Sequence, residues 1–120
     1  DEDVVLIAED NGIIGFIAVW CRPDPFIDNL HVIPPQRSKG LGSALLRSAA
    51  QQLLQKGHTT AYLWVVASNA RALVLYERLG GVPTDRALKP LFAHEAPHVK
   101  VEWPDISVLC SNKNGEELIV

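Results

Sequence analysis

Hydrophobic residues follow two different spacings along this chain, and the change of spacing separates expected strands from expected helices. The Asp10-Asn11-Gly12 turn joins the first two strands as a hairpin, because Asn and Gly tolerate a positive φ. Residues 82–97 are loop-rich in sequence, and 106–110 can continue the last strand past Pro104. Runs rich in β-branched and aromatic residues predict strands over 4–8, 13–20, 26–33, 61–67 and 99–103.

Two segments have helical spacing instead. A second helix is predicted over 70–79, capped by Ser68 or Asn69 and ended by the Gly80-Gly81 pair. The first and clearest helix, over 41–56, has one apolar face formed by Leu45, Leu46, Ala49, Ala50, Leu53 and Leu54. The resulting order, β-β-β-α-β-α-β, predicts an α/β (or α+β) fold in which helices pack on a mixed sheet.

Size and charge narrow the class of protein. A chain of 120 residues is one domain, 1–120, with one core. Lys and Arg number 11 against 14 Asp and Glu, a balance that disfavours nucleic acid as a partner. The longest stretch without Asp, Glu, Lys or Arg, residues 57–70, is too short to span a membrane. Two distant cysteines without a CxxC pattern favour the reducing cytoplasm.

Candidate chemistry gathers before the first helix, in Arg37-Ser38-Lys39-Gly40-Leu41-Gly42. Two glycines allow close approach of a ligand, and a helix N-terminus with two nearby cations suits phosphate. The segment lacks the Gly-Lys-Ser/Thr of a P-loop, and Leu45 stands where a dinucleotide motif needs Gly or Ala. Taken alone, it is equally compatible with a plain turn and helix start.

Two motifs together identify a family. Residues 30–46 resemble the acetyl-CoA signature of the GNAT superfamily of N-acetyltransferases, whose core Arg/Gln-x-x-Gly-x-Gly/Ala is matched by Arg37 to Gly42. Residues 69–80 resemble its Asn-x-x-Ala-x-x-x-Tyr-x-x-x-Gly helix, although Gly81 replaces the usual following aromatic residue. The resemblance covers residues 4–82. It implies a mixed, mostly antiparallel sheet flanked by helices, and acetyl transfer from acetyl-CoA to an amine.

The resemblance also implies residue roles. Asn69 contacts the cofactor arm, and Tyr76 lies near its sulfur, where a phenol can protonate the departing thiolate. The pantetheine arm lies between the strands 26–33 and 61–67, along backbone groups of Leu30, His31 and Val32. The pyrophosphate is held by backbone N–H groups of Arg37, Ser38, Lys39, Gly40, Leu41 and Gly42.

The proton acceptor is less clearly marked. Asp28 is the preferred general base, and regular alternation places it on the face opposite His31. A structural or exposed carboxylate is the alternative for Asp28, as a plain core role is for Tyr76. His94 and His98 have the spacing of a zinc pair, but no third ligand is evident, so no metal is expected.

Family members usually carry a strand and two helices before the hairpin with which this chain opens, so we expect the domain to be either truncated at its N-terminus or naturally short. A sheet edge and apolar surface are thereby exposed, so we expect a homodimer. The acidic balance favours a small-molecule amine as acceptor. The alternatives are a non-catalytic acyl-CoA-binding or regulatory module and, disfavoured by the missing P-loop residues, a phosphate-binding nucleotide module.

Overall fold

The structure is a computed structural model and describes residues 3–33 and 40–110. Most predicted elements lie within two residues of their expected bounds. In chain order, the elements are β1 (Val4–Glu9), β2 (Ile13–Trp20), β3 (Phe26–Val32), α1 (Leu41–Gln55), β4 (Ala61–Val66), α2 (Ala70–Arg78), β5 (Val82–Leu91), β6 (His94–Trp103) and the 3-10 helix η2 (Ile106–Cys110).

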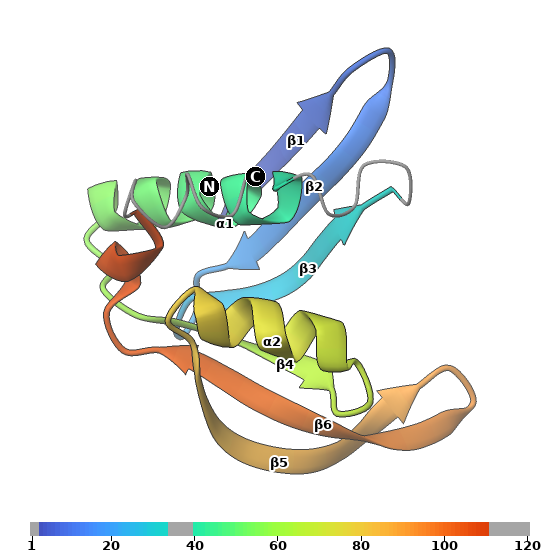
Figure 1. The fold of residues 1–120 in the computed structure, drawn as a ribbon. Helices are drawn as coiled ribbons and strands as arrows, with labels where there is room; N and C mark the ends of the chain where they lie inside the picture. Colours follow the sequence, from blue (N-terminus) through green and yellow to red (C-terminus); the bar gives the residue numbers. More distant parts are fainter. Residues whose placement is uncertain (1–2, 34–39, 111–120) are drawn as a thin grey trace.

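The strands form one mixed sheet in the order β1-β2-β3-β4-β6-β5 (Figure 1). Every neighbouring pair is antiparallel except β3 and β4, which run parallel. The parallel pair is joined through one residue pair, Phe26 with Tyr62, whereas β4 and β6 pair from Ala61 to Val66. The predicted fold class, a mostly antiparallel mixed sheet flanked by helices, is therefore confirmed.

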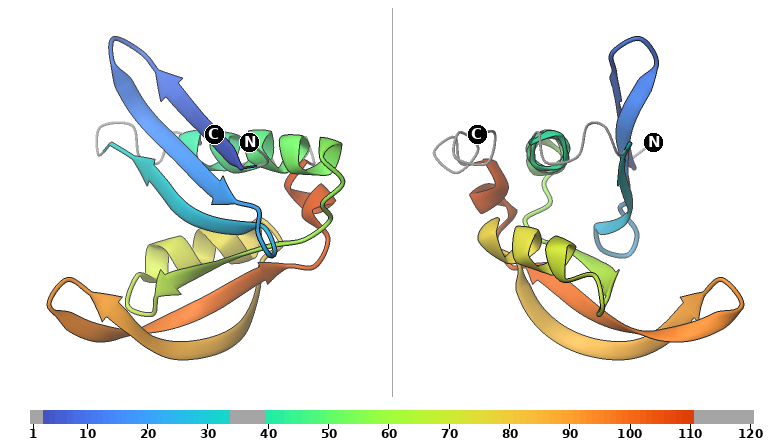
Figure 2. Two further views of the ribbon diagram at one scale, coloured as in Figure 1. Left: turned by 180° about the vertical axis from the view of Figure 1, so that it is seen from behind. Right: turned by 45° about the vertical axis from the view of Figure 1, so that its right-hand side comes forward.

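All three helical segments lie on the same side of the sheet (Figure 2). The apolar face predicted for α1 is the buried one, and the helix packs across β1, β2 and β3. Gly15 permits this approach: a Cβ at that position would lie 3.2 Å from a methyl carbon of Leu41 and 3.0 Å from the His31 carbonyl oxygen. The core lies between this face and the helices.

The other side of the sheet, which we call the open face, has no helix of the described residues packed on it (Figure 2). Strand alternation makes the contrast plain in β4, where Ala61, Leu63 and Val65 are buried under the helices and the residues between them are half-buried. Val5 and Ile7 remain 53% and 55% exposed. The open face carries Val5, Ile7, Phe16, Trp20, Tyr62 and Trp64.

The prediction of a loop over 82–97 was wrong, because β5 and β6 form a long hairpin with its tip at Phe92 and Ala93. Prolines at 83, 90 and 97 argued against strands, since proline cannot donate to a ladder. Here β5 is the edge strand of the sheet, where a missing donor is tolerated. Pro97 lies beyond the last β4–β6 pair and contributes its carbonyl, which accepts from Ala67 N–H at 2.9 Å.

Residues 106–110 also differ from prediction, since they form η2 and not a continued strand. Asp105 begins this turn: its Oδ1 accepts from the backbone N–H and from the hydroxyl of Ser107, at 3.0 and 2.7 Å. These hydrogen bonds lower the pKa of the Asp105 carboxyl. Trp103, which the sequence favours as a packing residue, is fully buried and donates its indole N–H to the Leu79 carbonyl at 3.2 Å.

Packing around Gly81 supplies a test of this core. A Cβ on Gly81 would lie 2.6 Å from Val101 Cγ1 and 3.0 Å from Trp103 Cζ2, both on fully buried side chains. We therefore expect Gly81→Ala to destabilise the protein by about 1–3 kcal/mol, the usual cost of overpacking a core. The matched control is Gly42→Ala, where a Cβ meets nothing within 4 Å in the part of the chain that the structure describes. It should be neutral or gain up to ~1 kcal/mol.

Urea denaturation of both variants measures the difference directly. Equal stability of the two variants would mean that Gly81 does not lie against Val101 and Trp103 as described.

Candidate functional site

The site is built around the separation of β3 from β4 after their single shared pair. Tyr62 donates its backbone N–H to the Pro25 carbonyl at 3.1 Å, so alternate residues of β4, beginning with Trp64, direct their N–H and C=O groups toward β3. On β3, Ile33 donates to Ile14 of the β2 side at 3.0 Å. By the same alternation, the backbone of Leu30 faces β4 and that of His31 faces β2.

The three residues whose backbone groups were predicted to lie along the pantetheine arm therefore do not all face β4. Leu30 and Val32 direct main-chain groups to the β4 side, whereas those of His31 belong to the β2–β3 ladder. The His31 side chain lies on the open face, 5.9 Å between ring centroids from Phe16. Its exposure fits a surface polar residue.

A β-bulge changes the expectation for Asp28. Ile27 pairs with Val19 and Asn29 with Ala18, so Asp28 is the extra residue between them. Asp28, Asn29 and His31 are all exposed. The predicted placement of Asp28 and His31 on opposite faces assumed regular alternation, which the bulge interrupts. Asp28 thus lies in the bulge of β3, two residues beyond Phe26, after which β3 and β4 separate.

The beginning of α1 has the geometry of an anion site. Gly40 is the N-cap residue with φ 81°, a left-handed conformation suited to glycine, and no side chain caps the helix. The first intrahelical bond runs from Ala44 N–H to the Gly40 carbonyl at 3.0 Å, so the amides of Leu41 and Gly42 precede it. No atom of the described residues lies within 4 Å of a Cβ placed on Gly42, so those residues leave a ligand access to these amides. Arg37, Ser38 and Lys39 lie outside the described residues.

Asn69 has a structural role in addition to the predicted ligand contact. Its Oδ1 accepts from Ala72 N–H at 3.2 Å and caps α2, as the sequence predicted for Ser68 or Asn69. The side-chain NH₂ remains available as a donor at the end of β4. The cap therefore fixes the amide orientation for which a contact was predicted.

Tyr76 packs in the core and still reaches accessible space. Its ring meets Trp103 edge-on, with 5.9 Å between centroids, and burial raises the pKa of the Tyr76 phenol. No hydrogen-bond partner of its hydroxyl is found in the part of the chain that the structure describes. Because no fully buried side-chain oxygen or nitrogen there lacks a partner, the hydroxyl must reach accessible space. Both sequence interpretations, core residue and proton donor, are compatible with this position.

Sequence reasoning missed the cation–aromatic pairs on the open face. Lys89 Nζ lies 4.2 Å from the Trp64 ring centroid, and Lys100 Nζ lies 4.6 Å from that of Tyr62. Tyr62 also stacks on Phe26 at 5.1 Å. Both lysines belong to the β5–β6 hairpin, with Lys89 on β5 and Lys100 on β6. Because β6 pairs with β4, the hairpin places the two lysines over the aromatic side chains of β4. The alternation of a correctly predicted hairpin would have placed them there.

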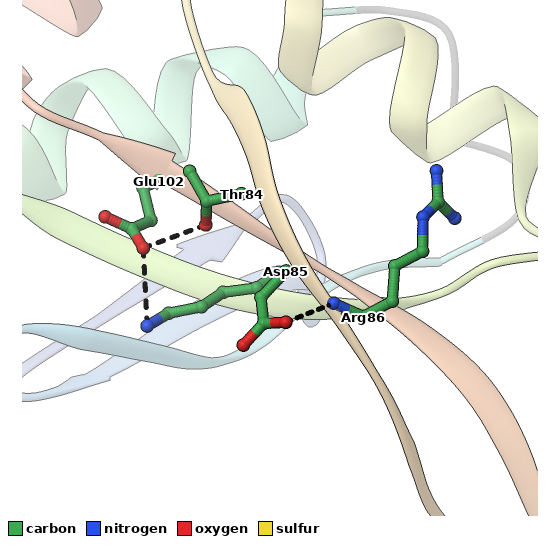
Figure 3. A network of polar contacts seen from close by, with 5 residues as sticks. Thr84, Asp85, Arg86 and Glu102 are labelled. Carbon is green, nitrogen blue, oxygen red and sulfur yellow. Dashed lines mark hydrogen bonds and ion pairs between the residues drawn. The ribbon is translucent and has the colours of Figure 1, made fainter.

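The carboxylate of Glu102 forms an ion pair with one of these two lysines, Lys100 (Figure 3). Its Oε2 lies 3.3 Å from Lys100 Nζ and accepts from the Thr84 hydroxyl at 2.8 Å. Lys89 has no carboxylate partner among the described residues. Within the same residues, no group of three His, Cys, Asp or Glu side chains could hold a metal, and no helix is long and apolar enough to cross a membrane.

Comparison with known proteins gives a consistent result. The sequence profile described as "Acetyltransferase (GNAT) family" matches residues 1–81. The chain is 34% identical over 89 residues to an uncharacterized N-acetyltransferase of Methanocaldococcus jannaschii, covering 67% of this chain and 39% of that protein. It is 30% identical over 70 residues to the thialysine N-epsilon-acetyltransferase of Mus musculus, covering 58% and 41%.

Among solved structures, the ribosomal-protein-S18-alanine N-acetyltransferase from Escherichia coli aligns with a TM-score of 0.77 and 26% identity. The alignment covers 88% of this chain and 70% of that one. This chain spans less than two thirds of the length of the curated relatives it matches.

The beginning of α1 provides a direct test of anion binding. We expect Gly42→Val to weaken CoA binding by about tenfold or more, ~1.4 kcal/mol, because its side chain fills the space through which a pyrophosphate would approach. Folding should be unaffected, since the added Cβ meets no atom of residues 3–33 or 40–110 within 4 Å.

Calorimetric titration with CoA measures the effect, and Ser48→Val, exposed on the same helix, is the control. Normal CoA affinity in folded Gly42→Val would exclude this end of α1 as the pyrophosphate site.

Proposed function

Because the chain belongs to the acetyltransferase (GNAT) family, we propose that it transfers an acetyl group from acetyl-CoA to an amine. The observation that carries the proposal is the separation of β3 and β4. It leaves the backbone groups of Leu30 and Trp64 directed toward each other's strand without a ladder between them. An extended pantetheine arm, with two amides of its own, has the hydrogen-bonding pattern to occupy that position.

The remaining parts of the cofactor have matching positions in the proposal. The uncapped amides of Leu41 and Gly42, at the positive end of the α1 dipole, suit the pyrophosphate. The side-chain NH₂ of Asn69 can donate a hydrogen bond to the pantetheine arm. Bound acetyl-CoA supplies the activated acetyl group, and the protein supplies positioning and proton transfer.

Proton movements follow from the chemistry of amide formation. A neutral amine attacks the thioester carbonyl, the nitrogen loses a proton, and the sulfur leaves with the C–S bonding pair. We assign protonation of that sulfur to Tyr76. Burial raises the pKa of its phenol above the ordinary value of 10.0, so the proton is present throughout the neutral range. Asp28 is the proton acceptor expected from the sequence, and its exposed position in the bulge of β3 makes it one candidate for that role.

Turnover with acetyl-CoA and three classes of amine tests the function. Two probes follow the names of the relatives, namely a peptide with an N-terminal alanine and thialysine; spermidine adds a polyamine. We propose a small-molecule amine as acceptor, on the acidic balance of the chain. CoA thiol release that depends on the amine is the expected result. Acetyl-CoA binding without release for any amine would favour the non-catalytic acyl-CoA-binding module.

We further propose that the protein works as a homodimer in the cytoplasm. Exposed Val5, Ile7 and Trp20 form apolar surface of a kind that proteins seldom leave bare, and both cysteines are free thiols. Light scattering should give twice the 13.2 kDa chain mass. A monodisperse monomer at high concentration contradicts the dimer.

Tyr76→Phe separates a proton donor from a core residue. The variant keeps the ring that meets Trp103 and removes a hydroxyl for which no partner is found among the described residues. We expect turnover to fall by about 10²–10⁴-fold, the usual contribution of a general acid, with melting temperature and CoA affinity nearly unchanged.

Val74→Ala, exposed on the same helix, is the control for nonspecific effects of changing α2. Unchanged turnover of Tyr76→Phe, alongside an active wild-type protein, would remove Tyr76 from the reaction.

A further inference from the structure

A buried histidine lies on the open face near the end of β4 and has no part in the reaction as described so far. His98 of β6 pairs with Val66 of β4, on the same side of the sheet as Tyr62 and Trp64. It is one of two polar or charged residues among those described that are buried, with 9% of its surface exposed. Its location is one strand away from the separation of β3 and β4.

The hydrogen bonding of His98 determines its tautomer. Nδ1 lies 2.9 Å from the carbonyl oxygen of Ala96. A carbonyl can only accept, so Nδ1 carries the hydrogen and, in the neutral ring, Nε2 keeps its lone pair. A carbonyl that holds Nδ1–H in this way leaves the ring oriented with Nε2 as the basic atom.

Nε2 also reaches accessible space. No partner for it is found among the described residues, and no fully buried side-chain nitrogen or oxygen there lacks a partner. The imidazole is therefore held by packing and by one hydrogen bond, while its basic nitrogen is accessible.

The charges on this face leave the imidazole without an acidic partner. On β5, Ala87 pairs with His98, and Asp85 and Lys89 lie on the same side of the hairpin. On β6, Glu102 is occupied by Lys100 and Thr84 (Figure 3). The nearest alternate positions of β4 carry only apolar or aromatic side chains. No carboxylate among the described residues pairs with His98.

We propose that His98 is the proton acceptor of the acetyl transfer; the inference rests on the proposed function. As the amine nitrogen forms its bond to the acetyl carbon, one N–H bond breaks and its proton passes to the Nε2 lone pair, directly or through one water. The C–S bond breaks, and the sulfur takes the Tyr76 proton. Return of a proton from His98 to the Tyr76 phenolate, by way of solvent, restores both groups.

Kinetics of His98→Gln test the proposal against a matched variant, His94→Gln, which changes an exposed histidine of the same strand. With an alkyl amine as acceptor, log(kcat/KM) of the wild type should fall at acid pH with a slope of about two, one proton from the amine and one from His98. His98→Gln should lose about 10²-fold in kcat and keep a slope of about one. His94→Gln should match the wild type.

Two further measurements exclude a merely structural effect. Added imidazole should restore part of the activity of His98→Ala and none of that of Asp28→Asn. Nitrogen-15 NMR of the wild type should show the Nδ1–H tautomer of His98, whether or not an acceptor amine is known. An Nε2–H tautomer, or wild-type rate and slope in His98→Gln, overturns the proposal.

Failure of the function itself gives a different pattern. If the wild-type protein releases no CoA thiol with any amine, the proposed function fails and the role of His98 fails with it. If the wild type is active and Asp28→Asn alone loses the second proton dependence, the function stands and Asp28 replaces His98.

Discussion

The separation of β3 from β4 is the constraint on which the proposed chemistry depends. Two parallel neighbours in a sheet ordinarily share a continuous ladder, because buried backbone groups need partners. Here the ladder stops after Phe26 and Tyr62, although β3 goes on pairing with β2 as far as Val32 and β4 with β6 as far as Val66. A ligand with amides of its own can form the hydrogen bonds that β3 and β4 do not form with each other.

Because the helices lie on one side of the sheet, the two sides contribute different groups to the proposed site. The side under the helices provides the core, the uncapped beginning of α1 and Tyr76, whose hydroxyl reaches accessible space from within the packing. The open face provides the cation–aromatic pairs and His98. In the proposed reaction the proton donor and the proton acceptor therefore approach from opposite sides of the sheet.

Elements with local signals were predictable from sequence, and elements that depend on distant partners were not. The apolar face of α1 and the Asn69 cap of α2 depend on residues that are close together in the sequence, so both could be predicted. The β5 strand was missed because its prolines are acceptable only at a sheet edge, and edge position depends on the whole topology. The bulge at Asp28 and the significance of His98 likewise come from pairing with other strands, which no local pattern reveals.

The central claim is that the cofactor arm occupies the separation between β3 and β4. Hydrogen–deuterium exchange with and without CoA tests it most directly. The account predicts that CoA slows exchange at the amides of Leu30 and Trp64 and in the first turn of α1. The β1–β2 hairpin, whose amides are already paired, should be unchanged. Tight CoA binding without added protection at Leu30 and Trp64 would contradict the account and place the ligand elsewhere.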